Sequence, residues 1–262
     1  MMFWLMACGV DYAVGMHELD EAPRPDGSDT ADTGATDTGD TADQDTGVAV
    51  PATAPIYGNT SEQLFEIDPD TGEKWLVGSF HDAEGPITYF VDIAIDMDGR
   101  LVGGTFDALY AIDPTDAAVT KICDIDVEMM ALAFTSDGRL FGGGDQTIRE
   151  IDTDTCTATE LLSGGYTTSG DLVGLPDGYL YWTVWGDDGD ELVRVDPTYG
   201  YTSWIGSIDG EKLFGLGYAE DTLYGFSALG EIVAIDPLTA KTTLRSGDGT
   251  IWWGATTNPV TW

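Results

Sequence analysis

Short apolar runs alternate with polar turn residues along most of this chain, and one pattern of runs returns at regular intervals. Each repeat contains an apolar run that ends in Ile or Val followed by Asp, and in four of the five repeats by Pro. These runs end at Ile67-Asp68-Pro69, Ile112-Asp113-Pro114, Ile151-Asp152-Thr153, Val195-Asp196-Pro197 and Ile235-Asp236-Pro237. The aspartates lie 45, 39, 44 and 40 residues apart. A period of this length, made of strand-like runs without a helical pattern, is typical of a four-stranded β-propeller blade.

Each repeat divides into four predicted strands. In the second repeat these strands cover residues 92–95, 100–106, 108–112 and 119–122. In three repeats an Asp-Gly pair separates the first strand from the second, and this pair favours a tight hairpin because Gly adopts positive φ without steric cost. The Asp-Pro pair after the third strand predicts the turn into the fourth.

The two ends of the repeat region complement each other. The first repeat begins at Pro55 and lacks an innermost strand, whereas residues 252–257 match an innermost strand and nothing more. We therefore expect the last strand to complete the first blade, which closes the ring and leaves no open sheet edge. The predicted fold is all-β, a five-bladed β-propeller over residues 50–262 that is closed by its C-terminal strand.

The residues before the propeller have a different composition. Residues 17–49 are rich in Asp, Thr and Gly and almost free of large apolar residues. They cannot bury enough surface to offset the entropy cost of ordering, so we expect a disordered acidic tether. Residues 1–16 resemble a truncated lipoprotein signal, because the segment Leu5–Gly9 resembles a bacterial lipobox in which Cys8 is lipidated.

The signal is shorter than expected, since only seven residues precede Cys8 and a signal peptide needs a basic segment and a longer apolar one. Either the true start lies upstream or Cys8 is incidental. The tether favours a lipoprotein, which predicts a cell-envelope location, anchored in the outer membrane or extracellular. We expect contact with the membrane only through the lipid anchor, because no other stretch is long and apolar enough to span a bilayer.

The chain is strongly acidic. Its formal net charge is −37, and residues 50–262 alone hold 36 acidic and 9 basic residues, which is a net charge of −27. Such a field repels nucleic acid and anionic membrane surfaces, so we expect neither as a partner. A solvated acidic surface explains the charge most simply, and binding of cations or cationic surfaces and a saline habitat are the alternatives.

Export would place Cys123 and Cys156 where a disulfide can form. In the repeat, Cys123 falls near the end of an outer strand, and Cys156 falls in the turn that opens the next outer strand. These places should lie near opposite faces of the ring. We therefore expect two thiols rather than a disulfide.

The sequence has no strong catalytic signature, such as a phosphate-binding glycine loop or a nucleophile elbow. Asp92 and Asp171 stand out, because each lies six residues before the Asp of an Asp-Gly turn and both should approach the channel. Two such carboxylates could act as acid and base on a glycosidic bond, could bind Ca²⁺, or could be hydrogen-bonded at strand starts. We expect no cofactor other than such a Ca²⁺ ion.

Ligands of propellers usually bind at the face around the channel mouth. The loops that lead into the innermost strands and those that join second to third strands should gather residues there, among them Phe90, Met129 and Phe214. We expect the ligand-binding residues to be Tyr166, Trp185, Phe226 and Trp252. Aromatic side chains on such a rim can stack on sugar rings or on peptide side chains, although packing between blades is the alternative for most of them.

The segment Leu109–Thr115 and the Asp-Gly-Arg-Leu turns at Asp98 and Asp137 resemble the repeats of bacterial quinoprotein-like, NHL and YVTN-type propellers. The resemblance covers residues 55–262 and implies the fold, but the cofactor-binding residues of quinoproteins cannot be located here. We expect a monomeric, non-enzymatic cell-envelope protein that binds a protein, peptide or glycan at the channel mouth. The alternative is a glycosidase-like enzyme that uses Asp92 and Asp171.

Overall fold

The computed structural model of the chain describes residues 56–69, 71–210 and 212–257, all within the second of two compact units, Ala49–Trp262. These residues form strands and connecting turns and no helix. Accordingly, the described segments hold no helix of the length and apolar character that a membrane span requires. The predicted signal, the tether and Cys8 lie outside the described residues.

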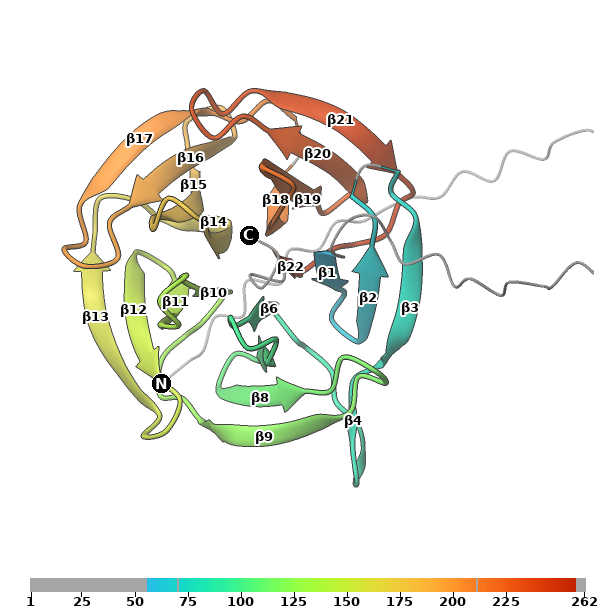
Figure 1. Cartoon of the computed structure of the whole chain (residues 1–262). Helices are drawn as coiled ribbons and strands as arrows, with labels where there is room; N and C mark the ends of the chain where they lie inside the picture. The colour runs from blue at the N-terminus through green and yellow to red at the C-terminus, as the bar shows by residue number, and fades with distance from the viewer. Residues whose placement is uncertain (1–55, 70, 211, 258–262) are drawn as a thin grey trace, which may run out of the picture. The chain divides into compact units, whose positions relative to one another are not determined.

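Five antiparallel four-stranded sheets stand around a central axis as blades, numbered here from the one that holds β1 (Figure 1). From the axis outward, blade 1 consists of β22 (Gly254–Thr257), β1 (Ile56–Asn59), β2 (Gln63–Ile67) and β3 (Lys74–Ser79). Blade 2 consists of β6 (Asp92–Ile95), β7 (Leu101–Gly104), β8 (Ala108–Ile112) and β9 (Val119–Asp124). Blade 3 consists of β10 (Ala131–Phe134), β11 (Leu140–Gly144), β12 (Thr147–Asp152) and β13 (Thr157–Ser163). Blade 4 consists of β14 (Thr168–Gly174), β15 (Leu180–Trp185), β16 (Asp190–Val195) and β17 (Thr202–Ser207). Blade 5 consists of β18 (Leu213–Ala219), β19 (Thr222–Ser227), β20 (Glu231–Ile235) and β21 (Thr242–Gly247), and a small hairpin of β4 (His81–Asp82) and β5 (Gly85–Pro86) connects blades 1 and 2.

The ring closes as the sequence predicts. β22 pairs with β1 in antiparallel register, with Gly254 opposite Asn59, so the last strand is the innermost strand of the first blade. The predicted all-β, five-bladed propeller is therefore confirmed. In blade 2, β6 and β8 have the predicted bounds, whereas β7 is shorter than predicted and β9 extends two residues further, to Asp124.

The repeated Asp after each third strand builds the same turn in every blade. Its backbone carbonyl accepts the N–H of the residue four positions later, at 2.7 to 2.9 Å, and that residue has positive φ. In blade 3, Asp152 Oδ1 also accepts the N–H groups of Asp154 and Thr155 at 2.8 and 3.0 Å, which makes the turn self-contained. The positive-φ residues of the five turns are Gly72, Ala117, Cys156, Gly200 and Ala240.

The hydrophobic core is divided among the five interfaces between neighbouring blades. Phe226 of blade 5, for example, packs with Ile56 of blade 1 and with Trp252, which lies just before the closing strand. The rings of Phe226 and Trp252 meet edge to face with their centroids 5.6 Å apart. Because a blade cannot bury its two faces alone, the core depends on every neighbour being in place.

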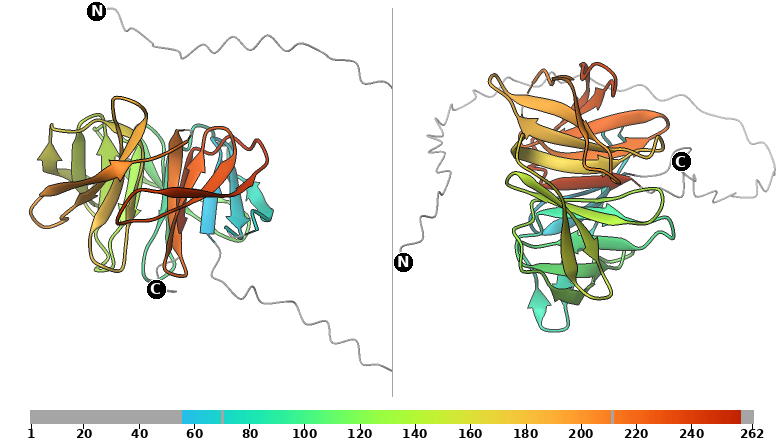
Figure 2. Two further views of the ribbon diagram at one scale, coloured as in Figure 1. Left: turned by 90° about the horizontal axis from the view of Figure 1, so that it is seen from above. Right: turned by 90° about the vertical axis from the view of Figure 1, so that its left-hand side faces the viewer.

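The outer strands follow one another around the ring (Figure 1). Each sheet is twisted, so its outer strand lies crosswise to its innermost strand (Figure 2). Each outer strand also contains one extra residue, a β-bulge, at Val77, Ile122, Leu161, Ile205 and Arg245. The residue after the bulge then reaches the positive-φ turn of the next blade, where Leu162, for example, lies against Gly200.

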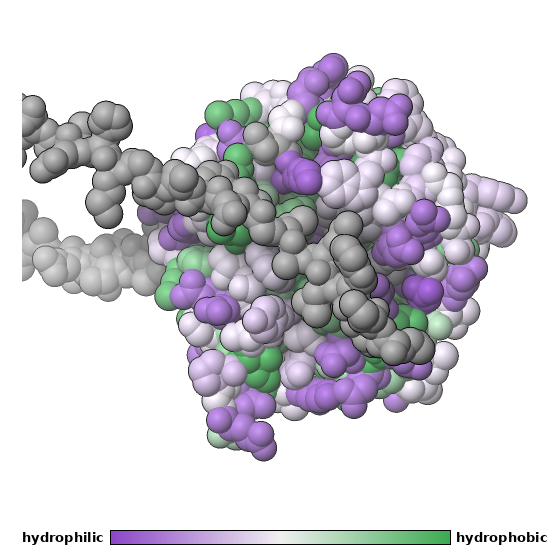
Figure 3. All heavy atoms as spheres, turned by 180° about the vertical axis from the view of Figure 1, so that it is seen from behind, coloured by the Kyte–Doolittle hydropathy of each residue, from purple (hydrophilic) through white to green (hydrophobic). Residues whose placement is uncertain are grey.

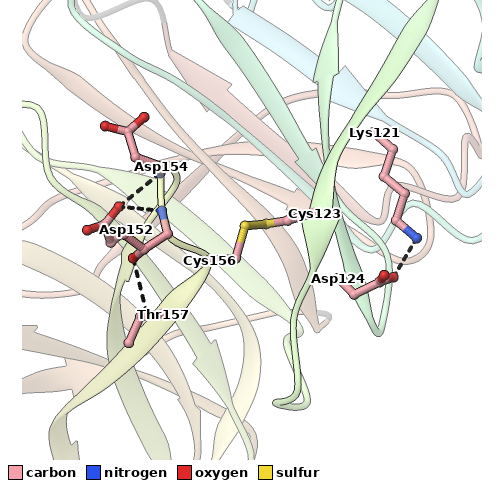
Figure 4. The surroundings of a disulfide bond; sticks show 8 residues. Lys121, Cys123, Asp124, Asp152, Asp154, Cys156 and Thr157 are labelled. Atoms are coloured by element: carbon pink, nitrogen blue, oxygen red, sulfur yellow. Dashed lines mark hydrogen bonds and ion pairs between the residues drawn. A yellow bond between two sulfur atoms is a disulfide. The ribbon is translucent and has the colours of Figure 1, made fainter.

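Cys123 and Cys156 occupy this junction between blades 2 and 3, and they form a disulfide with their Cα atoms 6.2 Å apart (Figure 4). The prediction of two thiols was wrong. The prediction assigned each cysteine to a face of the ring from its position along the repeat. It did not take the twist of the sheets into account. This twist brings the end of β9 to the start of β13.

The surface of the described propeller is mixed in character. On the face opposite to the view of Figure 1, hydrophilic side chains are spread widely with hydrophobic ones between them (Figure 3). Large hydrophobic side chains are exposed on several outer strands, at Trp75, Leu76, Trp204 and Leu244.

We expect the disulfide to stabilise the ring by about 2 to 4 kcal/mol, because it links residues 33 positions apart and so restricts the unfolded chain. Replacing both cysteines by serine should lower the free energy of unfolding by this amount in urea titrations. Dithiothreitol should have the same effect on the wild-type protein and none on the double variant. Equal stability of the two proteins would contradict a stabilising disulfide.

Candidate functional site

Five equivalent backbone N–H groups, one from each innermost strand, converge in the channel. They belong to Ile93, Leu132, Leu172, Leu216 and Ala255. Buried N–H groups are unfavourable unless each finds an acceptor. Convergent N–H groups also create a region of positive potential that suits an anion.

Two aspartates, Asp92 and Asp171, supply these acceptors. Asp92 accepts the N–H of Ile93 from its own blade at 2.8 Å and the N–H of Leu132 from blade 3 at 2.5 Å. Both carboxylate oxygens of Asp92 are therefore engaged, and its side chain is fully buried. The contact joins blades 2 and 3 at the axis.

Asp171 joins the remaining three blades. It accepts the N–H of Leu172 from its own blade and the N–H of Leu216 from blade 5, both at 2.5 Å, and the N–H of Ala255 in the closing strand. The side chain is fully buried and is hydrogen-bonded to that of Asp92. The pair thus connects all five blades.

The two carboxyl groups share one proton. Burial raises the pKa of Asp171 to about 7. Burial, together with the negative charge of Asp171, raises the pKa of Asp92 well above its usual range. Asp171 accepts three N–H groups and Asp92 only two, so the charged form is favoured at Asp171. The proton therefore favours Asp92, whose O–H can donate to Asp171.

Of the three roles considered for Asp92 and Asp171, the geometry favours the structural one, in which the carboxyl groups are hydrogen-bonded at the starts of strands. It does not favour catalysis or calcium binding. Asp92 and Asp171 are buried and in hydrogen-bond contact, whereas the carboxyl groups of a glycosidase lie about 5 to 9.5 Å apart across an open cleft. Their oxygens face N–H donors, an unfavourable environment for a cation. Among the described residues, no group of three or more His, Cys, Asp or Glu side chains is placed to hold a metal ion.

An apolar pocket of about 220 Å³ lies at the mouth of the channel. Each blade contributes to its wall the residue two positions before the converging N–H group. These residues are Val91, Met130, Gly170, Phe214 and Trp253. Phe106 and Ser169 complete the lining, whose polar side-chain groups among the described residues are the hydroxyl of Ser169 and the indole N–H of Trp253. The pocket is therefore formed jointly by the five blades.

None of the four predicted ligand-binding residues lines this pocket. Phe226 and Trp252 are buried in the core, with 0% and 1% of their surface exposed. Tyr166 is partly buried against the core between blades 3 and 4. Trp185 is 44% exposed, and Lys212 Nζ lies 4.2 Å from the centre of its ring.

Of the residues expected around the channel mouth, Phe214 lines the pocket, whereas three others lie one position before a lining residue. Phe90, Met129 and Trp252 point into the core, and the residue that follows each of them lines the pocket. Successive side chains of a strand point to opposite faces, so a shift of one position exchanges the buried and the accessible sets. Aligning the five repeats on the position of Asp92 and Asp171 would have identified the pocket residues, because in each repeat the pocket residue directly precedes this position.

Comparisons with known proteins support the fold. No family model matches the chain, and no curated protein matches it either. A total of 763 chains of solved structures match, among them a chain from the crystal structure of a nidogen/laminin complex. That match has a TM-score of 0.53 and 13% sequence identity, and it covers 78% of this chain and 97% of the other. At this identity the likeness shows the fold alone: the protein is a β-propeller, a fold that hosts many functions.

We expect the buried pair to make the protein more stable as the pH falls from about 8 to about 5. Both pKa values are raised above the ordinary value of about 3.9, so the folded state binds more protons than the unfolded chain in this range. The resulting stabilisation is complete below about pH 4 and is lost as the pH rises through about 7. Thermal unfolding across this pH range measures the effect.

The variant Asp92→Asn isolates this contribution from that of the surface charges. Its amide cannot titrate but can still donate a hydrogen bond to Asp171, so the dependence of the melting temperature on pH should become flatter. The amide nitrogen cannot accept an N–H group as the replaced oxygen does, so the variant should also be less stable at every pH. Asp98→Asn, which removes an exposed carboxylate from a hairpin turn, is the matched control and should keep the wild-type slope. An unchanged slope in Asp92→Asn would argue against a shared proton.

Proposed function

We propose that this propeller is a non-enzymatic binding protein whose ligand enters the apolar pocket at the channel mouth. The observation that carries the proposal is the convergence of the blades, since all five contribute one residue to a single concave wall. Concave, mainly apolar sites on a preformed scaffold are typical of ligand binding. The β-propeller fold also commonly mediates binding.

The lining favours an apolar side chain of a peptide or protein over a sugar. Met130, Phe214 and Trp253 offer thioether and aromatic surfaces, which suit aliphatic and aromatic groups. A sugar would need several polar partners for its hydroxyl groups. The single hydroxyl of the described lining, that of Ser169, is buried and is therefore poorly accessible to a sugar.

No observation favours the glycosidase alternative. Asp92 and Asp171 have no exposed surface, and their oxygens accept backbone N–H groups from five strands. Separating the two carboxyl groups to admit a sugar would break the contacts that join the blades.

The proposal includes a location outside the cytoplasm, at the cell envelope. The disulfide between Cys123 and Cys156 supports it, because structural disulfides persist mainly in oxidising compartments. In this proposal Cys8 carries the lipid anchor, and residues 17–49 hold the propeller away from the membrane.

Metabolic labelling with a radioactive fatty acid in a bacterial host tests the anchor. We expect the wild-type chain to incorporate the label and Cys8→Ala to lose it, because the Cys8 thiol would carry the acyl chain. The doubly substituted variant Cys123→Ser with Cys156→Ser is the control and should remain labelled. Labelling that survives in Cys8→Ala would contradict an anchor at Cys8.

Serine substitutions at Phe106 and Met130 test the pocket. These residues are 47% and 38% exposed, so we expect their replacement to change the free energy of unfolding by less than about 1 kcal/mol. On an array of peptides and glycans, the wild-type protein should bind peptides that contain Leu, Phe or Met. The double variant should bind them at least about tenfold more weakly, which corresponds to about 1.4 kcal/mol.

The matched control replaces Tyr199 and Tyr201 by serine. Their stacked rings are 69% and 72% exposed in a turn of blade 4 away from the pocket, so peptide binding should not change. Binding that survives in the Phe106 and Met130 variant, or binding of glycans alone, would contradict the proposal.

A further inference from the structure

Five exposed carboxylates lie in the loop before β10 and in the turns that join β11 to β12 and β15 to β16. We call Asp126, Glu128, Asp145, Asp187 and Asp188 the acidic crescent. In the part of the chain that the structure describes, no member of the acidic crescent forms an ion pair. Its negative charge is therefore open to a ligand.

Two members of the acidic crescent, Glu128 and Asp145, lie in loops that adjoin the pocket wall. Glu128 lies two residues before the pocket residue Met130. The backbone carbonyl of Glu128 lies next to Gly144, which directly precedes Asp145. The carbonyl of Asp145 in turn accepts the N–H of Thr168 at 2.7 Å, and Thr168 directly precedes Ser169 of the pocket. A ligand seated in the pocket would therefore lie close to the loops that carry Glu128 and Asp145.

Basic residues are scarce on this side of the ring. Within the described loops that border the pocket, the one basic residue is Lys212, and its ammonium group lies over the ring of Trp185. Some exposed carboxylates elsewhere on the ring do have partners. Lys241, for example, pairs with Asp209 at 3.1 Å.

We propose that the ligand of this site is a basic peptide segment, which places an apolar side chain in the pocket and Lys or Arg side chains on the acidic crescent. This inference rests on the proposed function and specifies its ligand class. Each exposed ion pair would contribute about 0.2 to 1 kcal/mol. The net charge of −27 on residues 50–262 would also speed the approach of a cationic segment.

Three capped hexapeptides test the inference by calorimetric titration of the full chain. The peptide Ac-KKLFKK-NH2 combines apolar and basic groups, Ac-SSLFSS-NH2 lacks the charges, and Ac-EELFEE-NH2 reverses them. We expect the lysine peptide to bind about tenfold more tightly than the serine peptide, and the glutamate peptide not to bind. Raising the salt concentration should weaken the lysine peptide and leave the serine peptide unchanged.

Two double variants test whether the carboxylates of the acidic crescent, rather than negative charge elsewhere, attract the lysine peptide. Glu128→Gln combined with Asp145→Asn should weaken the lysine peptide about fivefold, because two exposed ion pairs are lost. Glu73→Gln combined with Asp98→Asn removes the same charge from exposed turns outside the loops that border the pocket, and it should leave binding unchanged. Thermal unfolding checks that both variants remain folded.

The outcomes separate this inference from the proposed function. Equal binding of the lysine and serine peptides, with loss of both in the Phe106 and Met130 serine variant, would overturn the basic ligand and keep the pocket. Equal weakening by the two charge variants would overturn the role of the acidic crescent. Failure of all three peptides to bind would overturn this inference, and an array without apolar peptide binding would overturn the proposed function as well.

Discussion

The hydrogen-bonded carboxyl pair at the centre of the ring is the interaction on which the rest of the structure depends. Five innermost strands bring five N–H groups into the interior, and each of them needs an acceptor. Asp92 takes two and Asp171 takes three, and their shared proton lets two buried carboxyl groups lie in contact with a single negative charge. One donor is Ala255, so the same pair that joins the blades also fastens the closing strand.

The sequence predicts this architecture well because the repeat is local. The Asp after each third strand builds its turn from its own carboxylate and carbonyl, so its signal does not depend on distant residues. The alternation of apolar residues and the lone innermost strand at the C-terminus then determine the number of blades and the closure. Register also predicted that Asp92 and Asp171 approach the channel. Their role stayed open, because the sequence does not show that backbone N–H groups from other blades would engage their oxygens.

Features that depend on the three-dimensional twist were not predicted. Cys123 and Cys156 meet because the outer strand lies crosswise to the inner one, which a flat drawing of the repeat leaves out. Alignment of the junctions would have paired them, since Cys156 takes the place of the Gly or Ala with positive φ and Cys123 follows the bulge, as Gly206 does in blade 4. Among the residues expected at the channel mouth, Phe214 lies in the pocket wall, whereas Phe90, Met129 and Trp252 are displaced from it by one residue because side chains of a strand alternate.

The carboxyl pair and the pocket are coupled through the backbone. The pocket residue of each blade stands only two positions before the N–H group that the pair binds, so the pair also fixes the positions of the pocket walls. A wall held in this way loses little freedom when a ligand binds, which favours affinity. The charge of the pair itself is balanced by five N–H groups and contributes little to the field outside. The electrostatic preference of the site is therefore determined by exposed carboxylates at its rim, and these can change without disturbing the ring.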